Sequence, residues 1–315
     1  LGATMQSRES VDILITGGTI ITMDSARRVL DDGAIAIRGD RIVAIGPTRA
    51  LTDRFIGRDQ IDAKRKIIMP GLIDGHGHAG HGLVKSLGMD TEKWYPATEQ
   101  IYARGSTVEF WRAEALLTGV ERVRFGVTTA LSMFGGDMIM RTDDQKYGDA
   151  YLKATQDVGI RFVLAVGPRR LPFPKTYTEW NGDSSRDVSV TFAQQLAVSE
   201  ALIKRWHGTA DGRLNIAVTF PTHIPAENRV SGAALDELKS QARTTRELSR
   251  KYKLLFTQDG HTTGSVTFAD ALGLLGPDAI LSHATEFTDE EIATLARTRT
   301  RIVHNPSANA ATRRR

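Results

Sequence analysis

The sequence predicts an α/β protein in which a small β domain precedes a larger domain of alternating strands and helices. Residues 11–68 consist of short apolar runs separated by turn residues, a pattern that indicates β-strands. From Pro70 onward, apolar runs alternate with longer segments of helical spacing, which indicates βα units and a parallel sheet. We therefore assign residues 1–68 to the small β domain and residues 69–315 to the larger domain.

The composition is that of an ordinary globular protein, with 41% hydrophobic and 25% charged residues among 315. The absence of cysteine excludes disulfides and thiolate metal ligands, so any metal ion must be held by histidine and carboxylate side chains. The net charge of +4 is small and the basic residues are scattered, apart from a run at 313–315, so we expect no nucleic-acid partner.

No run in the sequence approaches the roughly 20 apolar residues of a membrane-spanning helix. Residues 1–10 lack the apolar segment of a signal peptide. We therefore expect a cytoplasmic protein that has a small-molecule substrate and no membrane partner. The sequence leaves open whether the chain forms a homo-oligomer.

The expected strands of the β domain are short and are separated by turns that contain glycine. They cover residues 11–16, 19–23, 34–37 and 41–45, with turns at 17–18 and 38–40. Strands of this length and spacing form a small sheet or half of a sandwich.

Seven strands and six helices are expected in the larger domain. The strands cover residues 72–78, 126–133, 160–166, 214–220, 254–257, 279–282 and 301–303. The helices cover residues 107–125, 149–158, 191–207, 235–252 and 266–275, and the sixth begins after Thr288, where acidic residues suit a helix N-terminus. Residues 79–106 and 168–188 show no clear period, so we expect irregular loops there.

The first strand of the larger domain ends in the pattern Asp74-x-His76-x-His78. Because side chains alternate along a strand, these three point to the same face, and two imidazoles so placed can bind one metal ion. A site made of histidine and carboxylate suits zinc, iron or manganese. The alternative is a pair of solvated loop histidines, because His-x-His alone is a common pattern.

With its Pro-Gly lead-in, this stretch resembles the amidohydrolase superfamily, whose first barrel strand carries the same metal motif, and the resemblance covers nearly the whole chain. It implies a (β/α)8 TIM barrel with a small β-sandwich-like domain, and it points to the deaminase and chlorohydrolase branch. Such a barrel needs eight strands to close, and about seven are found here. We therefore expect an incomplete barrel that lacks the metal-binding aspartate of the eighth strand. Truncation at the C-terminus is the favoured explanation, and a partner chain that covers the gap is the alternative.

Six of the eight histidines follow predicted strand ends, where barrel enzymes place their catalytic groups; they are His76, His78, His223, His261, His283 and His304. The resemblance implies that His283 contacts the metal-activated water or the substrate as a catalytic residue. It also implies that His223 and His304 contact the substrate, and Trp94 is a candidate for an aromatic wall around it. No lysine occurs between residues 218 and 225, which disfavours a two-metal site.

The fifth strand departs from the family pattern, in which a metal-binding histidine precedes a proton-transferring glutamate by three residues. The matching positions here are Gln258 and His261. In the favoured interpretation His261 is the third metal ligand beside His76 and His78, reached by a bend at Gly260. In the other, Gln258 is a weak ligand or contacts the substrate, and His261 carries out proton transfer as a catalytic residue.

The resemblance implies a hydrolase that acts on carbon–nitrogen bonds other than peptide bonds. Deamination or deamidation of a nitrogen heterocycle by metal-activated water is the leading expectation. The implied cofactor is one divalent metal ion, zinc in the first place, with iron and manganese as alternatives. A hydrolytic dechlorinase and a catalytically inactive remnant of such an enzyme are the alternative functions.

Overall fold

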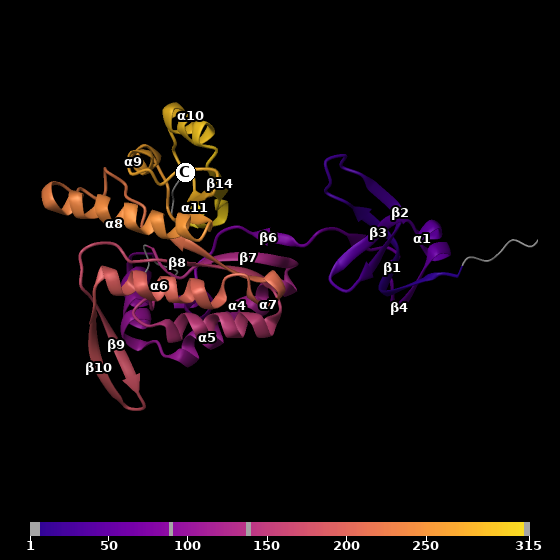
Figure 1. Cartoon of the computed structure of the whole chain (residues 1–315), viewed down its shortest axis with the longest axis horizontal. Coiled ribbons are helices and arrows are strands. Elements are labelled where there is room, and N and C mark those ends of the chain that lie inside the picture. The colour runs from indigo at the N-terminus through magenta and orange to yellow at the C-terminus, as the bar shows by residue number, and fades with distance from the viewer. Residues whose placement is uncertain (1–6, 88–90, 137–139, 312–315) are drawn as a thin grey trace, which may run out of the picture. The chain divides into compact units, whose positions relative to one another are not determined.

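The computed structural model describes residues 7–87, 91–136 and 140–311 (Figure 1). The basic run at 313–315 lies outside these residues. The chain divides into two compact units, Leu1–Gly71 and Leu72–Arg315, whereas the sequence suggests a boundary after residue 68. None of the helices in the described ranges is long and apolar enough to span a lipid bilayer.

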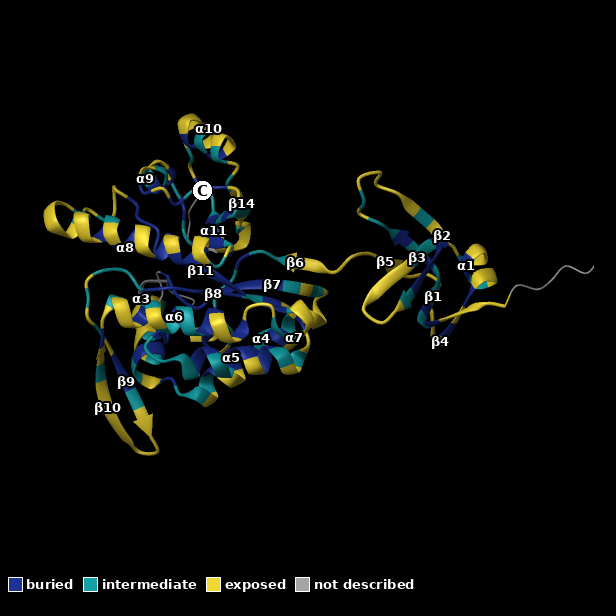
Figure 2. Ribbon diagram, viewed as in Figure 1, coloured by how far each residue is buried: buried dark blue, intermediate teal, exposed yellow. Residues whose placement is uncertain are grey.

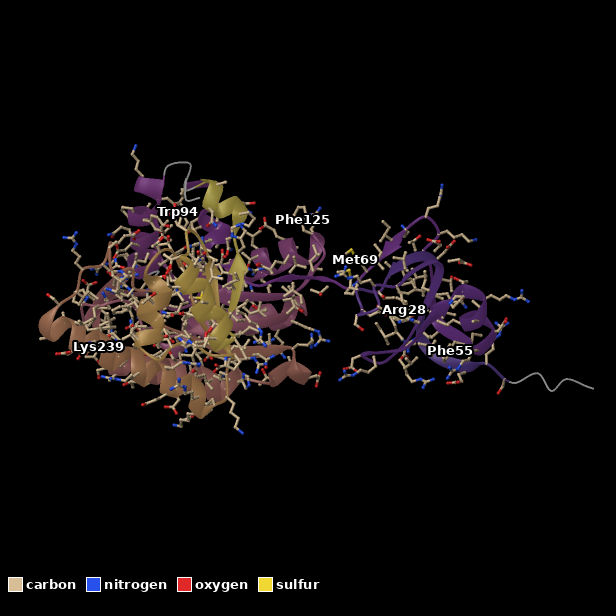
Figure 3. The ribbon with its side chains drawn as sticks, turned by 90° about the horizontal axis from the view of Figure 1, so that it is seen from above. Arg28, Phe55, Met69, Trp94, Phe125 and Lys239 are labelled. Carbon is tan, nitrogen blue, oxygen red and sulfur yellow. The ribbon has the colours of Figure 1, made fainter. Side chains whose placement is uncertain are left out.

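The first unit is one five-stranded sheet with a short helix. Its elements are β1 (Glu9–Ile21), β2 (Val29–Arg38), β3 (Arg41–Pro47), α1 (Thr48–Arg54), β4 (Phe55–Asp62) and β5 (Ile67–Ile68). The strand order is β3-β2-β1-β4, and β5 also pairs with β1. The core of this unit packs Val11, Leu14 and Ala36 against Leu51 of α1 and against Phe55, which is labelled in Figure 3.

The second unit is built on a seven-stranded sheet whose neighbouring strands all run parallel. Its order follows the chain, and its strands are β6 (Leu72–Asp74), β7 (Val127–Met133), β8 (Arg161–Val166), β11 (Leu214–Thr219), β12 (Phe256–Gln258), β13 (Ala279–His283) and β14 (Arg301–His304). The predicted α/β class is confirmed, with a curled parallel sheet that is consistent with an incomplete barrel. The strands β6 and β14 form the two edges of this sheet.

Helices connect the strands and cover the sheet (Figure 1). They are α4 (Val108–Arg124), α5 (Gln145–Val158), α6 (Phe192–Trp206), α7 (Thr209–Gly212), α8 (Gly232–Lys251), α9 (Ser265–Ala271), α10 (Asp289–Thr298) and α11 (Pro306–Ala311). Thr288 caps α10 as expected, because its hydroxyl accepts from the Glu291 N–H and the Glu291 carboxylate accepts from the Thr288 N–H. Figure 2 shows that the central strands β8 and β11 are mostly buried and that exposed residues lie on the outer sides of the helices.

Two segments that the sequence predicts as irregular are ordered elements. Residues 79–106 contain α2 (His81–Val84), η1 (Lys85–Leu87), α3 (Thr91–Glu99) and η2 (Gln100–Gly105), and Pro96 inside α3 obscures the helical pattern. Residues 168–188 contain most of a β-hairpin, β9 (Lys175–Asn181) and β10 (Ser184–Val190). The loop predictions for these two segments were therefore wrong.

The ends of the central strands approach each other closely at Gly167, which follows β8. A Cβ atom at this position would lie 1.9 Å from the carbonyl oxygen of Thr219, at the end of β11. Only glycine lets the two backbones meet at this distance, because real Cβ atoms do not come so near to a backbone oxygen. The ends of β8 and β11 therefore depend on this glycine for their spacing.

We expect Gly167→Ala to lower the free energy of unfolding by about 2–3 kcal/mol, because the clash is with backbone that cannot rotate away. Gly105→Ala is the matched control, since the nearest atom to its Cβ would be the Gln100 carbonyl oxygen at 3.8 Å. The control should change stability by less than about 0.5 kcal/mol. Urea unfolding followed by circular dichroism measures both, and equal losses would contradict the role of Gly167.

Candidate metal centre

The segment that carries His76 and His78 follows β6 and is held against the end of β7. The N–H of Met133 donates to Gly77 O at 2.8 Å, and the N–H of Ala79 donates to Met133 O at 2.9 Å. Asp74 does not join the two histidines, because its Oδ2 accepts from Nε of Arg122 at 2.9 Å. It acts as a structural anchor for this segment.

The carboxylate of Asp259 lies at the meeting point of three imidazoles. Its Oδ1 is 2.9 Å from Nε2 of His76 and 3.2 Å from Nε2 of His283, and its Oδ2 is 3.1 Å from Nε2 of His78. The Ser282 hydroxyl donates to Oδ1 at 2.7 Å and holds the carboxylate in place. These residues come from the ends of β6, β12 and β13, so three strand ends converge on one point. The sequence analysis did not select Asp259, although an acidic residue directly after the fifth strand was a usable signal.

Burial and neighbouring charges have opposite effects on the pKa of Asp259, and also on the pKa of His76. Burial raises the pKa of Asp259, but the charge of His78 and the contacts with His283 and His76 outweigh it and hold that pKa well below its usual range. Burial lowers the pKa of His76, and Asp259 offsets this only in part. An ionised carboxylate beside a neutral imidazole is the combination that a divalent metal ion requires.

The donor atoms of His76, His78 and Asp259 fit a metal ion. They all lie within 4.8 Å of one another. Among the described residues, both ring nitrogens of His76 and Nδ1 of His78 are buried without a hydrogen-bond partner, and Nε2 of His76 is near Asp259 but not aligned for a hydrogen bond. Buried polar atoms normally find a partner, so these nitrogens point to a ligand. Two imidazoles and one carboxylate suit zinc, iron or manganese.

His261 lies behind this cluster rather than in it. Its Nδ1 is 2.9 Å from the Ser265 hydroxyl and its Nε2 is 3.3 Å from the Thr222 hydroxyl, so each nitrogen already has a neighbour. The ring is fully buried, and burial lowers its pKa to about 3. The structure therefore brings together two of the three expected ligands, with Asp259 in the third position of the cluster.

The other candidates on the fourth and fifth strands lie beside His261. Gln258 is the last residue of β12, and its amide donates to Pro221 O at 3.3 Å, while its Oε1 is buried without a hydrogen-bond partner in the described part of the chain. The His223 ring packs on Phe268 with 4.5 Å between centroids. Burial and the charge of Arg170 lower the pKa of His223, so its ring is held neutral.

The His283 ring reaches the cluster from the end of β13. His304, the last residue of β14, is the strand-pairing partner of His283. Nδ1 of His304 donates to His283 O at 3.0 Å, and the His304 side chain is otherwise exposed. Trp94 is separated from the cluster by His81, whose ring stacks on His78 at 4.6 Å and meets Trp94 edge-on at 4.7 Å. Figure 3 labels Trp94. The sequence analysis did not select His81, which lies beside His78 at the start of α2.

Glu114 of α4 fixes the loop that follows the two histidines. Its carboxylate accepts from the N–H groups of Gly80, Gly82 and Leu83 at 3.1, 3.0 and 2.7 Å. The side chain is fully buried, and burial raises its pKa against the effect of the three donors. This single residue therefore satisfies the free N–H groups at the start of α2 and ties the loop to the helix layer.

We expect Glu114→Gln to weaken both the fold and metal binding, because an amide NH2 would face backbone N–H groups. The unfolding free energy should fall by about 2–3 kcal/mol and metal affinity by about 10–100-fold. Glu109→Gln, on the exposed first turn of the same helix, is the control and should cost less than about 0.5 kcal/mol. Urea unfolding and chelator competition measure the two quantities, and similar values for both variants would argue against this role.

A parallel sheet of βα units with imidazoles and a carboxylate gathered beyond its strand ends is an arrangement typical of metal-dependent hydrolases. The chain belongs to the amidohydrolase family, because residues 67–314 match the model of that family. Residues 33–55 match a second model, described as an imidazolonepropionase-like composite domain of bacteria.

Curated relatives of the chain include deaminases. The 5'-deoxyadenosine deaminase of Methanococcoides burtonii is 26% identical over 304 residues, which cover 95% of this chain and 63% of that protein. A 5-methylthioadenosine/S-adenosylhomocysteine deaminase of Nitratidesulfovibrio vulgaris is 30% identical over 306 residues, which cover 95% of this chain and 62% of that protein. The chain thus spans slightly less than two thirds of the length of these relatives.

Solved structures share the fold. An adenosine deaminase from Xanthomonas campestris with bound zinc superposes with a TM-score of 0.76 at 20% identity, covering 98% of this chain and 65% of that one. A triazine hydrolase from Arthobacter aurescens gives a TM-score of 0.69 at 22% identity, covering 95% and 66%. At these identities the likeness establishes the fold of the chain.

Proposed function

We propose that the larger unit carries the site of a metal-dependent hydrolase that acts on carbon–nitrogen bonds other than peptide bonds. The observation that carries this proposal is the convergence of His76, His78, Asp259 and His283 from three strand ends. Family membership and the names of the deaminase relatives support it. The leading reaction is hydrolytic deamination of a nitrogen heterocycle in a small molecule.

His76, His78 and Asp259 would hold the metal ion, with zinc as the first expectation. A divalent ion in such a site supplies water that is activated at neutral pH. The chain's part is to hold two imidazoles and one ionised carboxylate together in a largely buried setting, where Asp259 is only 16% exposed. His261 remains the alternative third ligand. To bind a metal ion, its ring would have to turn away from the hydroxyls of Thr222 and Ser265.

His283 is the candidate for contact with the reacting groups, because its Nε2 faces the cluster and it is not one of the three ligands. Gln258, His223, His304 and Trp94 are proposed to contact the substrate. For Gln258 the support is that its buried Oε1 has no hydrogen-bond partner among the described residues, and such an acceptor suits an N–H or amino group.

We expect Asp259→Asn to reduce metal content from about one ion per chain to near zero, because an amide is a poor ligand and loses the charge. His76→Ala should do the same, whereas His261→Gln should keep the ion. Asp157→Asn, at an exposed position of α5, is the matched control. Elemental analysis decides between the two third ligands: if metal is lost from His261→Gln and kept in Asp259→Asn, the assignment must be reversed.

The reaction itself is tested by ammonia release. Zinc-loaded chain is incubated with adenosine-type nucleosides, guanine and other amino-substituted heterocycles, and we expect release from at least one of them. The release should require metal and should be absent in His76→Ala. If the loaded protein releases ammonia from none of these substrates, deamination is the wrong reaction for this chain.

A further inference from the structure

We propose that Asn309 is a positioning residue that keeps a proton on Nδ1 of His283, so that Nε2 is the ring nitrogen that exchanges protons at the metal centre. The inference deepens the proposed function and rests on it for its catalytic meaning. The contacts between Asn309 and His283 are made within the chain, so their effect on the proton of His283 can be tested without a substrate.

The segment after β14 brings two asparagines to the same strand end as His283. Asn305 lies directly before α11, and Asn309 lies within α11, four residues later. Residues four apart on a helical turn share a face, so the two side chains lie on the same side. The N–H of His283 donates to Oδ1 of Asn305 at 3.3 Å. The two asparagines in residues 304–309 therefore have a structural role: within one turn of chain, they bind both the backbone and the ring of His283.

The side-chain amide of Asn309 contacts both the backbone and the ring of His283. Its Oδ1 lies 2.6 Å from Nδ1 of His283, and its Nδ2 lies 3.4 Å from His283 O. A carbonyl oxygen only accepts, so the amide must turn its NH2 toward that carbonyl and its oxygen toward the ring. The ring must then be the donor, which places the proton on Nδ1. Asn309 is 4% exposed, so water does not compete for this contact.

Nε2 of His283 is consequently left as the atom that faces Asp259, at 3.2 Å. With Nδ1 held protonated, Nε2 is the nitrogen that gains or loses a proton: protonated, it donates to the Asp259 oxygen, and deprotonated, it can accept a proton from a reacting group. In the Nε2–H form the ring would donate to Asp259 and compete with a metal ion for its oxygen. The orientation of Asn309 thus selects the form of His283 that is compatible with an occupied centre.

The backbone around His283 needs the support that these contacts give. His283, Ala284 and Glu286 have φ values of 69°, 56° and 56°, in the left-handed region that is unfavourable for residues other than glycine. Such conformations persist where the surroundings impose them. The bonds from Asn305, Asn309 and His304 to the backbone of His283 are the visible constraint on this turn.

The proton position can be measured by NMR on protein labelled with 15N-histidine, at pH 8, with and without zinc. Long-range proton–nitrogen correlations distinguish a protonated from an unprotonated Nδ1, and His283→Gln identifies the signal. We expect a protonated Nδ1 in the wild-type chain and in Asn309→Asp, which keeps an acceptor oxygen. Asn309→Ala should shift the proton to Nε2, whereas Ser307→Ala, at an exposed position of the same helix, should leave it on Nδ1.

A wild-type ring protonated on Nε2 alone would overturn the inference, and so would a proton that stays on Nδ1 in folded Asn309→Ala. Circular dichroism establishes that each variant is folded, and the wild-type measurement decides even if Asn309→Ala is not. With a substrate in hand, kcat should fall about 10–100-fold in Asn309→Ala with a smaller change in KM, and Asn309→Asp should restore most of it. Absence of any turnover would count against the proposed function, while the NMR result would still decide the role of Asn309.

Discussion

The shared carboxylate of Asp259 is the interaction on which the rest of the site depends. A largely buried charge is stable only where partners surround it, and here three imidazoles and the Ser282 hydroxyl do so. Because these partners come from separate strands, the carboxylate requires those strand ends to lie within a few ångströms of one another. A fold that spreads these ends would therefore leave the charge of Asp259 unpaired and would separate the donor atoms that could hold a metal ion.

The remainder of the larger unit can be understood as support for this convergence. Gly167 lets two central strands approach each other, and the pairing of Asp74 with Arg122 anchors the strand before His76. Glu114 holds the loop after His78, and Asn309 holds His283. None of these supporting residues is itself among His76, His78 and Asp259. The geometry of the proposed ligands is thus set by neighbouring residues outside the ligand set, as is usual for metal sites.

The sequence predicted those features that follow from the spacing of apolar residues and from the direction of the strands. Alternating strands and helices gave the parallel sheet, and parallel strands bring His76, His78 and His283 to one edge whatever the details of the loops. Contacts set by local turns were harder to predict. The hairpin β9–β10 was missed although Gly182-Asp183 is a two-residue hairpin signal, with Gly182 at φ +61°, because the neighbouring prolines suggested an irregular loop.

The fifth strand shows why residue types alone could not settle the third ligand. Gln258, Asp259 and His261 all follow the same apolar run, and imidazole is the stronger expectation for a site of this family. Gly260 has φ +79°, which turns the chain after Asp259 and carries His261 toward Thr222 and Ser265. Gly260 lies outside any strand, so strand alternation says nothing about that turn. The bend that was expected to bring His261 to His76 and His78 instead leaves Asp259 beside them, so the composition of this cluster depends on one backbone angle.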